Sequence, residues 1–196
     1  KQDDVRDYLE SLSSWINDME GYYANTDQKM PQNINLTSLD DTNTLDSNGT
    51  QIGALVGYFE EGYIINCNVN GSAIIYDGKN IGGLVGHTKG TVQIENSISN
   101  IETISGSYNI GGLIGCAKGK TIIENSTNNS KVIGSLYNVG GLVGNANSDL
   151  YITKCNNNGE ISNYEGMAAN NIGGLVGYIN EGHYFLVKEG INRGVI

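Results

Sequence analysis

The chain has 196 residues, of which 28 are glycine and one is proline; 38% are hydrophobic and 16% are charged. This balance excludes a charge-rich disordered chain and favours many short strands joined by tight turns, because Gly and Asn tolerate the positive φ angles that turns need. The formal net charge of −10 argues against nucleic acid and anionic lipid as partners. No apolar run reaches the roughly 18 residues of a membrane span, so we expect no direct membrane insertion.

The first 50 residues do not repeat, and we expect residues 1–50 to form an N-terminal helix followed by an irregular capping coil. Apolar residues recur at helical spacing between Val5 and Met19, which predicts an amphipathic helix that ends near Gly21. Because an open β-edge promotes aggregation, we interpret this helix as a cap for the β-structure that follows, with self-association as the alternative. A short strand is expected around Ile34.

Oxygen-bearing side chains gather after this strand, within residues 40–48. They are Asp40, Asp41, Asp46 and Asn48. Because their spacing misses the EF-hand pattern, a solvated loop is expected, and a calcium site is the less favoured alternative.

A seven-residue motif repeats through residues 51–196, the second expected domain. Its copies are QIGALVG at 51–57, NIGGLVG at 80–86, NIGGLIG at 109–115, NVGGLVG at 138–144 and NIGGLVG at 171–177. Successive copies start 29 residues apart three times and 33 apart once (80 − 51, 109 − 80, 138 − 109, then 171 − 138). Each unit holds three short apolar runs separated by turn residues. The pattern predicts an all-β fold, a right-handed parallel β-helix (β-solenoid) of about five three-sided coils that stack about 4.8 Å apart.

Stacking places residues that are 29 apart in common columns. One inward row is expected to be Leu55, Leu84, Leu113, Leu142 and Leu175. Another column is Asn80, Asn109, Asn138 and Asn171. We interpret the asparagines as a hydrogen-bonded amide ladder at a turn, with a ligand site as the less favoured alternative. The same spacing aligns Ile65 with Ile94, and Gly71 with Asn100.

The three cysteines, Cys67, Cys116 and Cys155, do not form a disulfide framework. Cys67 and Cys155 would lie in neighbouring columns three coils apart, roughly 14 Å by the stacking distance. A disulfide needs Cα atoms within about 7 Å, so free thiols are expected. The two histidines, His87 and His183, have no second metal ligand nearby in the sequence.

A catalytic site needs acid, base or nucleophilic groups that converge. The repeat region has only two aspartates, Asp77 and Asp149, and no unit gains a cluster of charged residues. We therefore predict no catalytic residues, no metal and no cofactor. A β-helical carbohydrate-active enzyme, either a polysaccharide lyase or a glycoside hydrolase, and a purely structural spacer stay open as alternatives.

Binding is expected where the repeat varies. Tyr108 and Tyr137 are 29 residues apart and mark one corner of the coil, together with Tyr76 and Tyr164. We predict Tyr108, Tyr137 and Tyr164 as ligand-binding residues, because exposed, stacked tyrosines suit sugar rings or a partner protein; the alternative is an aromatic ladder that only stiffens a turn. The four extra residues near 162–170 predict a bulged loop and a second contact site. The position that follows each motif also varies: Tyr58, His87, Cys116, Asn145 and Tyr178.

The Gly-Leu-bulky-Gly core of the motif, Gly83–Gly86 and its copies, resembles the GLUG repeat of bacterial surface and secreted proteins. Asn66-Cys67 keeps part of the Asn-Cys strand of that family, whereas Asn96-Ser97 and Asn125-Ser126 depart from it, as does Ala54 within the first motif. The resemblance covers roughly 51–196. It implies an extracellular or cell-surface, adhesin-like, non-catalytic module that binds a host or matrix glycoprotein or glycan. Some family members are regions of IgA-cleaving metallopeptidases, but their HExxH motif is absent from this sequence.

The two ends of the chain carry expectations of their own. Lys1 in place of Met predicts that an N-terminal segment was removed, for which a secretion signal is one explanation. Ile196 lies inside an expected strand with no polar cap after it, which favours a longer natural protein over an end covered by a partner chain.

Overall fold

The computed structural model describes residues 33–35, 51–75 and 78–196. The chain divides into two compact units, Lys1–Pro31 and Gln32–Ile196, and the described residues belong to the second. The helix expected between Val5 and Met19 and the oxygen-rich loop at 40–48 lie outside the described residues. Within the described ranges no helix is long and apolar enough to cross a membrane.

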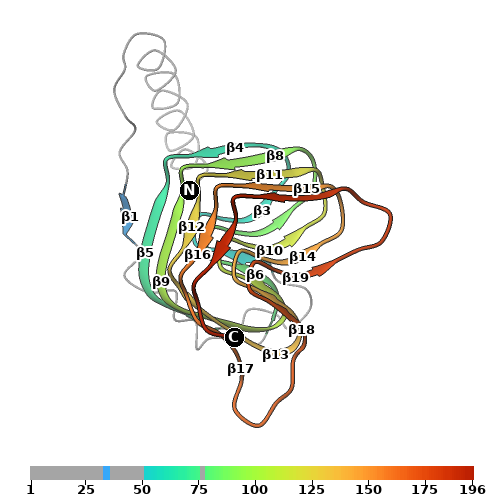
Figure 1. Cartoon of the computed structure of the whole chain (residues 1–196). Helices are drawn as coiled ribbons and strands as arrows, with labels where there is room; N and C mark the ends of the chain where they lie inside the picture. Colours follow the sequence, from blue (N-terminus) through green and yellow to red (C-terminus); the bar gives the residue numbers. More distant parts are fainter. Residues whose placement is uncertain (1–32, 36–50, 76–77) are drawn as a thin grey trace, which may run out of the picture. The chain divides into compact units, whose positions relative to one another are not determined.

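The described residues form three β-sheets that wind into a parallel β-solenoid of about four turns (Figure 1). The motif sheet consists of β3 (Val56–Phe59), β7 (Val85–Thr88), β10 (Ile114–Ala117), β14 (Val143–Ala146) and β19 (Val176–Ile179). The second sheet consists of β4 (Gly62–Ile65), β8 (Val92–Glu95), β11 (Thr121–Glu124), β15 (Leu150–Thr153) and β20 (Phe185–Lys188). The solenoid is thus slightly shorter than the five coils expected.

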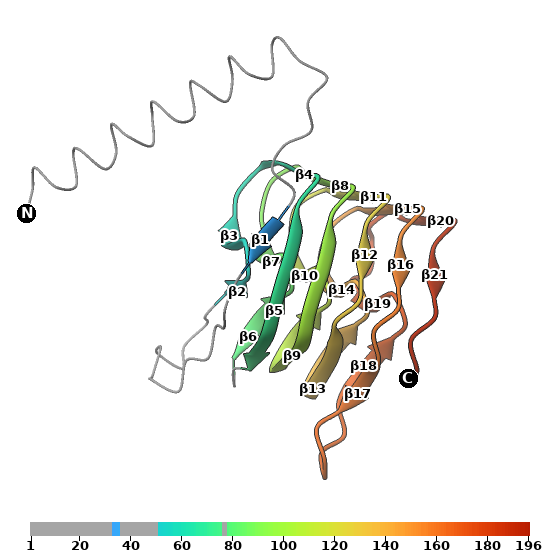
Figure 2. The ribbon, with the colours of Figure 1, turned by 90° about the vertical axis from the view of Figure 1, so that its left-hand side faces the viewer.

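The third sheet, which we call the long sheet, has 11 strands and forms the remaining side of the coils. Its strands in the first coils are β1 (Asn33–Asn35), β2 (Ile52–Gly53), β5 (Asn68–Ile75), β6 (Lys79–Gly82) and β9 (Ile98–Gly111). Those in the later coils are β12 (Thr127–Asn128), β13 (Lys131–Gly140), β16 (Asn156–Asn157), β17 (Ile161–Asn163), β18 (Asn170–Gly173) and β21 (Ile191–Asn192). Figure 2 shows β5, β9, β12, β16 and β21 side by side in the order in which the chain visits them. The strand expected around Ile34 is confirmed as β1, which pairs with β5.

The core is built from the predicted rows of identical residues. Leu84, Leu113 and Leu142 are completely buried, whereas Leu55 and Leu175, at the two ends of the row, are only partly buried. A leucine in a middle coil has a leucine above and below it, and an end leucine lacks one of these neighbours. Full burial of such a side chain is worth about 1.5–3 kcal/mol, so the middle of the stack contributes most of the stability.

The first coil is out of register with the second by one residue. The turn between β3 and β4 has two residues, 60 and 61, whereas the turn between β7 and β8 has three, 89–91. The predicted alignment of Ile65 with Ile94 is therefore wrong: Ile64 pairs with Ile94 and is 6% exposed, and Ile65 points outward with 39% exposed.

The asparagine column at the start of the motifs is a hydrogen-bonded ladder, as predicted. The side-chain amide nitrogen of each asparagine donates to the amide oxygen of the one before it, over 2.7–2.8 Å. All four residues have φ between 54° and 62°, a left-handed conformation that Asn adopts more readily than most residues. The ladder thus fixes the same turn in every coil.

Two further asparagine ladders follow the long sheet. An exposed ladder runs through Asn70, Asn100, Asn129 and Asn158. Asn70 takes the place that the sequence spacing had assigned to Gly71, for the same one-residue shift. A buried ladder joins Asn128 to Asn157 and Asn157 to Asn192, with bonds of 2.8 and 2.7 Å.

The buried ladder explains the second glycine of the motif. A Cβ atom added to Gly112 would overlap the Asn128 side chain and the Gly141 carbonyl oxygen. Glycine allows the motif backbone of one coil to lie directly against the long sheet and the next coil. Ala54, the exception in the first motif, lies in the first coil, where it packs at the edge of the core.

The Asn-Cys and Asn-Ser pairs are equivalent in structure. Asn66, Asn96 and Asn125 all have positive φ. The thiol of Cys67 donates to the carbonyl oxygen two residues earlier, at 3.4 Å, and the hydroxyl of Ser97 does the same at 2.8 Å. Serine therefore makes the same hydrogen bond as cysteine at this corner, so the departures from the family pattern leave the turn unchanged.

Candidate functional site

The predicted tyrosines lie at a corner of the long sheet, just before the motif. The strand register places four residues in one column there: Lys79, Tyr108, Tyr137 and Asn170. The register between β9 and β13 shifts between Gly134 and Tyr137, which is a β-bulge directly before the second tyrosine. Bulges often lie next to functional sites, because they redirect the side chains that follow. We call these four residues the tyrosine corner.

Tyr108 and Tyr137 stack on each other, with ring centroids 5.5 Å apart and an angle of 18° between the ring planes. Tyr137 is 43% exposed and Tyr108 is half-buried. The ammonium nitrogen of Lys79 lies 5.3 Å from the centroid of the Tyr108 ring, within cation–π range. Lys79 thus covers one end of the tyrosine stack. The sequence analysis did not identify this contact, although Lys79 precedes its own motif as Tyr108 and Tyr137 precede theirs.

Tyr164 does not lie in the column of Tyr108 and Tyr137, and its role in ligand binding stays a prediction. Asn170, not Tyr164, follows Tyr137 in the column, because the four extra residues fall between Asn163 and Asn170. Tyr164 is 53% exposed, and its backbone N–H donates to the carbonyl of Gly134 at 2.9 Å. The inserted loop between β17 and β18 extends away from the stacked coils, beside the tyrosine corner, and lies at the lower edge of Figure 1. Tyr76, named with the same corner, lies outside the described residues.

The variable position after each motif forms a column along the motif sheet. Tyr58 stacks on His87 with centroids 5.2 Å apart, and Cys116, Asn145 and Tyr178 continue the column. Burial, followed by the nearby Lys118 charge, lowers the pKa of His87. Burial raises the pKa of Cys116 to about 11, so this thiol is protonated at neutral pH. Such a column stiffens the sheet but lacks the thiolate that a cysteine nucleophile needs.

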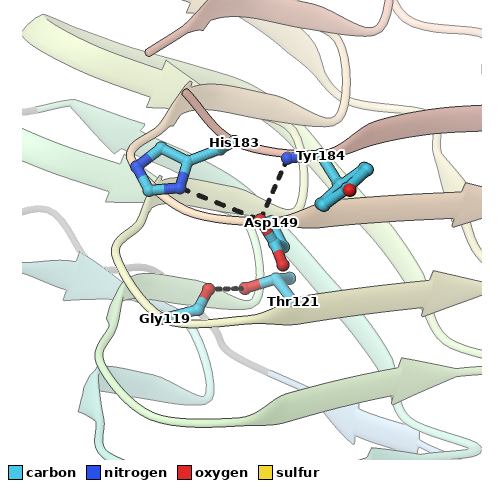
Figure 3. A network of polar contacts seen from close by, with 5 residues as sticks. All are labelled: Gly119, Thr121, Asp149, His183 and Tyr184. Carbon is cyan, nitrogen blue, oxygen red and sulfur yellow. Dashed lines mark hydrogen bonds and ion pairs between the residues drawn. The ribbon is translucent and has the colours of Figure 1, made fainter. Parts of the chain in front are cut away.

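A further irregular turn joins β19 to β20, and sequence reading missed it. It has five residues, 180–184, where the equivalent turns of the three middle coils have three. Asp149 holds it: the backbone N–H of Tyr184 donates to Asp149 Oδ1 at 3.0 Å, and His183 Nδ1 lies 3.8 Å from the same oxygen (Figure 3). The distance in sequence between the last motif and the apolar run that follows it is longer than in the middle coils, and this difference could have revealed the turn.

Ionisable groups are sparse among the described residues. No group of three or more His, Cys, Asp or Glu side chains gathers there. Within the described ranges two lysine–carboxylate ion pairs, Lys89–Glu60 and Lys131–Glu160, lie on the surface, each at 2.8 Å. The three cysteines are free thiols. The described surface is therefore shaped by tyrosines, amides and turns more than by charge.

These features define a parallel β-solenoid, a repeat protein in which equivalent residues stack from coil to coil. A model of the GLUG motif matches residues 106–133, which supports the GLUG resemblance of the repeat in this part of the chain. A family of unknown function (DUF7660) matches residues 1–42. No curated protein and no solved structure matches the chain.

Proposed function

We propose that this protein is an extracellular, adhesin-like module that carries no catalytic site and binds a glycan or glycoprotein of a host or matrix through the tyrosine corner. The observation that supports the proposal is the stacked, partly exposed Tyr108–Tyr137 pair. Tyrosine joins a flat apolar ring to a hydroxyl group, and this combination suits the apolar faces and the hydroxyl groups of a sugar.

The solenoid supports this role by holding the rings in place. Each tyrosine directly precedes an asparagine of the motif ladder, Asn109 or Asn138, and the two asparagines are joined by a bond of 2.8 Å. A binding surface that is already ordered loses less conformational entropy when it meets its ligand. Tyr164, on the inserted loop beside the corner, is proposed as a contact that a larger ligand reaches.

The proposal also covers the finer features of the fold and its setting. The solenoid winds right-handed, as parallel β crossovers nearly always do. The protein is secreted or displayed on a bacterial surface, in line with the GLUG resemblance.

The test is binding of the full chain to an array of host glycans, mucin-type glycoproteins and matrix glycoproteins, at physiological salt and at higher salt. We expect a reproducible hit that survives the higher salt, because stacking on tyrosine is screened far less than surface charge. The double variant Tyr108→Ala/Tyr137→Ala should weaken that hit at least tenfold.

Tyr151→Ala is the matched control. Tyr151 lies in the second sheet, and the Lys120 ammonium lies 5.5 Å from its ring centroid, so it repeats the lysine–tyrosine pair away from the corner. This variant should bind like the parent. A blank array would leave the solenoid as a spacer, and unchanged binding by the double variant would mean that the tyrosine pair only stiffens its turn.

A further inference from the structure

A pocket of about 270 Å³ opens between the first and second coils, away from the tyrosine corner. It is lined by Glu61, Gly62, Tyr63, Thr91 and Gln93. These residues come from the two turns that lead from the motif sheet into the second sheet and from the first residues of β4 and β8. No residue of the tyrosine corner contributes to this lining.

The pocket arises from the one-residue difference between the two turns. Gly62 stands opposite Val92, so the shorter turn of the first coil lies against the longer turn of the second. Gly62 has a φ of 126°, which only glycine adopts readily, and its N–H donates to the Thr91 carbonyl at 3.0 Å. The hollow is therefore a consequence of how the two coils join.

Three contacts hold the wall of the pocket in place. The backbone N–H of Lys89 donates to the Phe59 carbonyl at 3.1 Å, and that of Gly90 donates to the Glu60 carbonyl at 2.5 Å. The Lys89 side chain forms its ion pair with Glu60 at 2.8 Å. These contacts tie the two turns together next to Glu61.

The carboxylate of Glu61 is folded back against the second turn. A Cβ atom on Gly90 would lie 3.2 Å from Glu61 Cβ and 3.4 Å from its Oε2. The tightest contact of such a Cβ atom would be the Glu60 carbonyl oxygen, at 2.8 Å, so glycine at position 90 lets the two turns lie this close together. Beside it, Tyr63 is 71% exposed and presents an open ring to solvent.

We propose that this pocket binds one uncharged pyranose unit of a glycan. The Tyr63 ring offers an apolar surface for a sugar ring, and the Glu61 carboxylate accepts hydrogen bonds from sugar hydroxyl groups. Gln93 and Thr91 can each donate and accept, as alternating sugar hydroxyls require. The volume lies just below the roughly 300–1,000 Å³ of pockets for drug-sized ligands, which fits a single sugar unit.

The charge of the lining selects among sugars. Its described residues include a carboxylate and no lysine or arginine, and the protein as a whole carries a formal net charge of −10. An anionic sugar would meet repulsion from both the pocket and the whole molecule. Neutral hexoses and N-acetylated hexoses are the expected ligands. This inference rests on the proposed function in one respect, that the protein binds glycans, and the pocket is a separate site from the tyrosine corner.

The experiment titrates the full chain with the methyl glycosides of glucose, galactose, mannose and N-acetylglucosamine, observed by saturation-transfer NMR. N-acetylneuraminic acid and choline serve as anionic and cationic probes. We expect at least one neutral glycoside to bind and the anionic sugar not to bind. Tyr63→Ala and Gln93→Ala should each weaken the binding at least tenfold.

Tyr151→Ala is again the matched control, because Tyr151 belongs to the same column of the second sheet as Tyr63 and Gln93, two coils beyond the pocket. Its binding should equal that of the parent. Both tyrosines lie on the outer face of the sheet, so unchanged circular dichroism and melting temperature would show that the variants fold.

Three outcomes would overturn the pocket: no neutral glycoside binds, Tyr63→Ala binds as well as the parent, or choline binds and displaces the sugar. The last would assign the pocket to ammonium groups held by a ring and a carboxylate. Failure of the tyrosine corner gives a different pattern: Tyr108→Ala/Tyr137→Ala then binds the array like the parent, while Tyr63→Ala still loses the monosaccharide.

Discussion

The middle coils and the end coils of this solenoid carry the same motif in different surroundings. Leu113 in the middle is completely buried, whereas Leu175 in the last coil is only partly buried. The pocket beside Tyr63 and the Asp149-bound turn both involve an end coil, where turn lengths change. The comparison teaches that regular stacking makes the scaffold, and that departures from it, including the bulge before Tyr137, shape the surface that meets a ligand.

The largest expected effect concerns the leucine row. Leu113→Ala should lower the free energy of unfolding by about 2–5 kcal/mol, because it removes buried contacts and leaves a cavity between two coils. Leu175→Ala should lower it by clearly less, because that side chain already meets solvent on one side. Urea unfolding followed by circular dichroism measures both values. Equal losses would show that the last coil is packed like the middle ones.

The two long-sheet ladders offer the next comparison. Asn157→Ala removes a buried amide that donates to Asn192 Oδ1 and to the Gly159 carbonyl at 2.7 and 2.8 Å, and it should lower the free energy of unfolding by about 1–3 kcal/mol. Asn129→Ala, in the exposed ladder, should lower it by less than about 1 kcal/mol, because water replaces the lost bonds. Urea unfolding measures both variants. A larger loss of unfolding free energy for Asn129→Ala than for Asn157→Ala would refute the distinction between the buried and the exposed ladder.

A smaller effect, of opposite sign, is expected at Lys154. This residue has a φ of 54° at the corner where Asn96 and Asn125 sit in the other coils. Lys154→Asn should raise the free energy of unfolding by up to about 1 kcal/mol, because Asn adopts this left-handed conformation more readily. Asn125→Lys is the reciprocal variant and should destabilise. Thermal melting of both variants tests the pair, and shifts of the same sign would contradict the explanation.

The smallest effect concerns pH. Hydrogen bonds from Lys89 and Lys131 lower the pKa values of Glu60 and Glu160 below their ordinary value of 4.5. A carboxyl with a lowered folded-state pKa stabilises the fold above its ordinary pKa, and this contribution is lost as the pH falls from 4.5 through the lowered value. Both side chains are exposed, so solvent screens the ion pairs and we expect only a slight loss of melting temperature in this window.

The matched variant for this effect is Glu160→Gln, which keeps the shape of the side chain and removes its charge. Its melting temperature should vary slightly less with pH than that of the parent between pH 5 and the acid limit of folding. A steeper dependence in the variant would show that Glu160 does not contribute in the stated direction.

Much of the fold could be predicted because each coil repeats the same local chemistry. The 29-residue spacing placed Asn80, Asn109 and Asn138 in one ladder, and the ladder is present. The register of the first coil could not be predicted, because two shifts cancel there. Ala73 pairs with Thr103, 30 residues on, and Lys79 pairs with Tyr108, 29 residues on, so the distance between motifs hides both changes.

The binding surfaces were predictable only in part, for a related reason. Tyr108 and Tyr137 could be paired from their spacing, whereas Tyr164 could not be placed, because the insertion moves it out of the column and brings Asn170 into it. The pocket could not be predicted from the sequence, because no single residue in it departs from the repeat pattern. It depends on a two-residue turn that lies against a three-residue turn, a relation that only the strand register reveals.

The most direct test of the division between scaffold and surface is amide hydrogen exchange of the full chain, free and saturated with the best-binding glycan of the array. In the free chain we expect the slowest exchange in β7, β10 and β14 and faster exchange in β3 and β19. With glycan, added protection should appear at the tyrosine corner and at the turns around residues 60–62 and 89–91. Added protection confined to the regular strands β11 and β15, or none at all, would contradict this division.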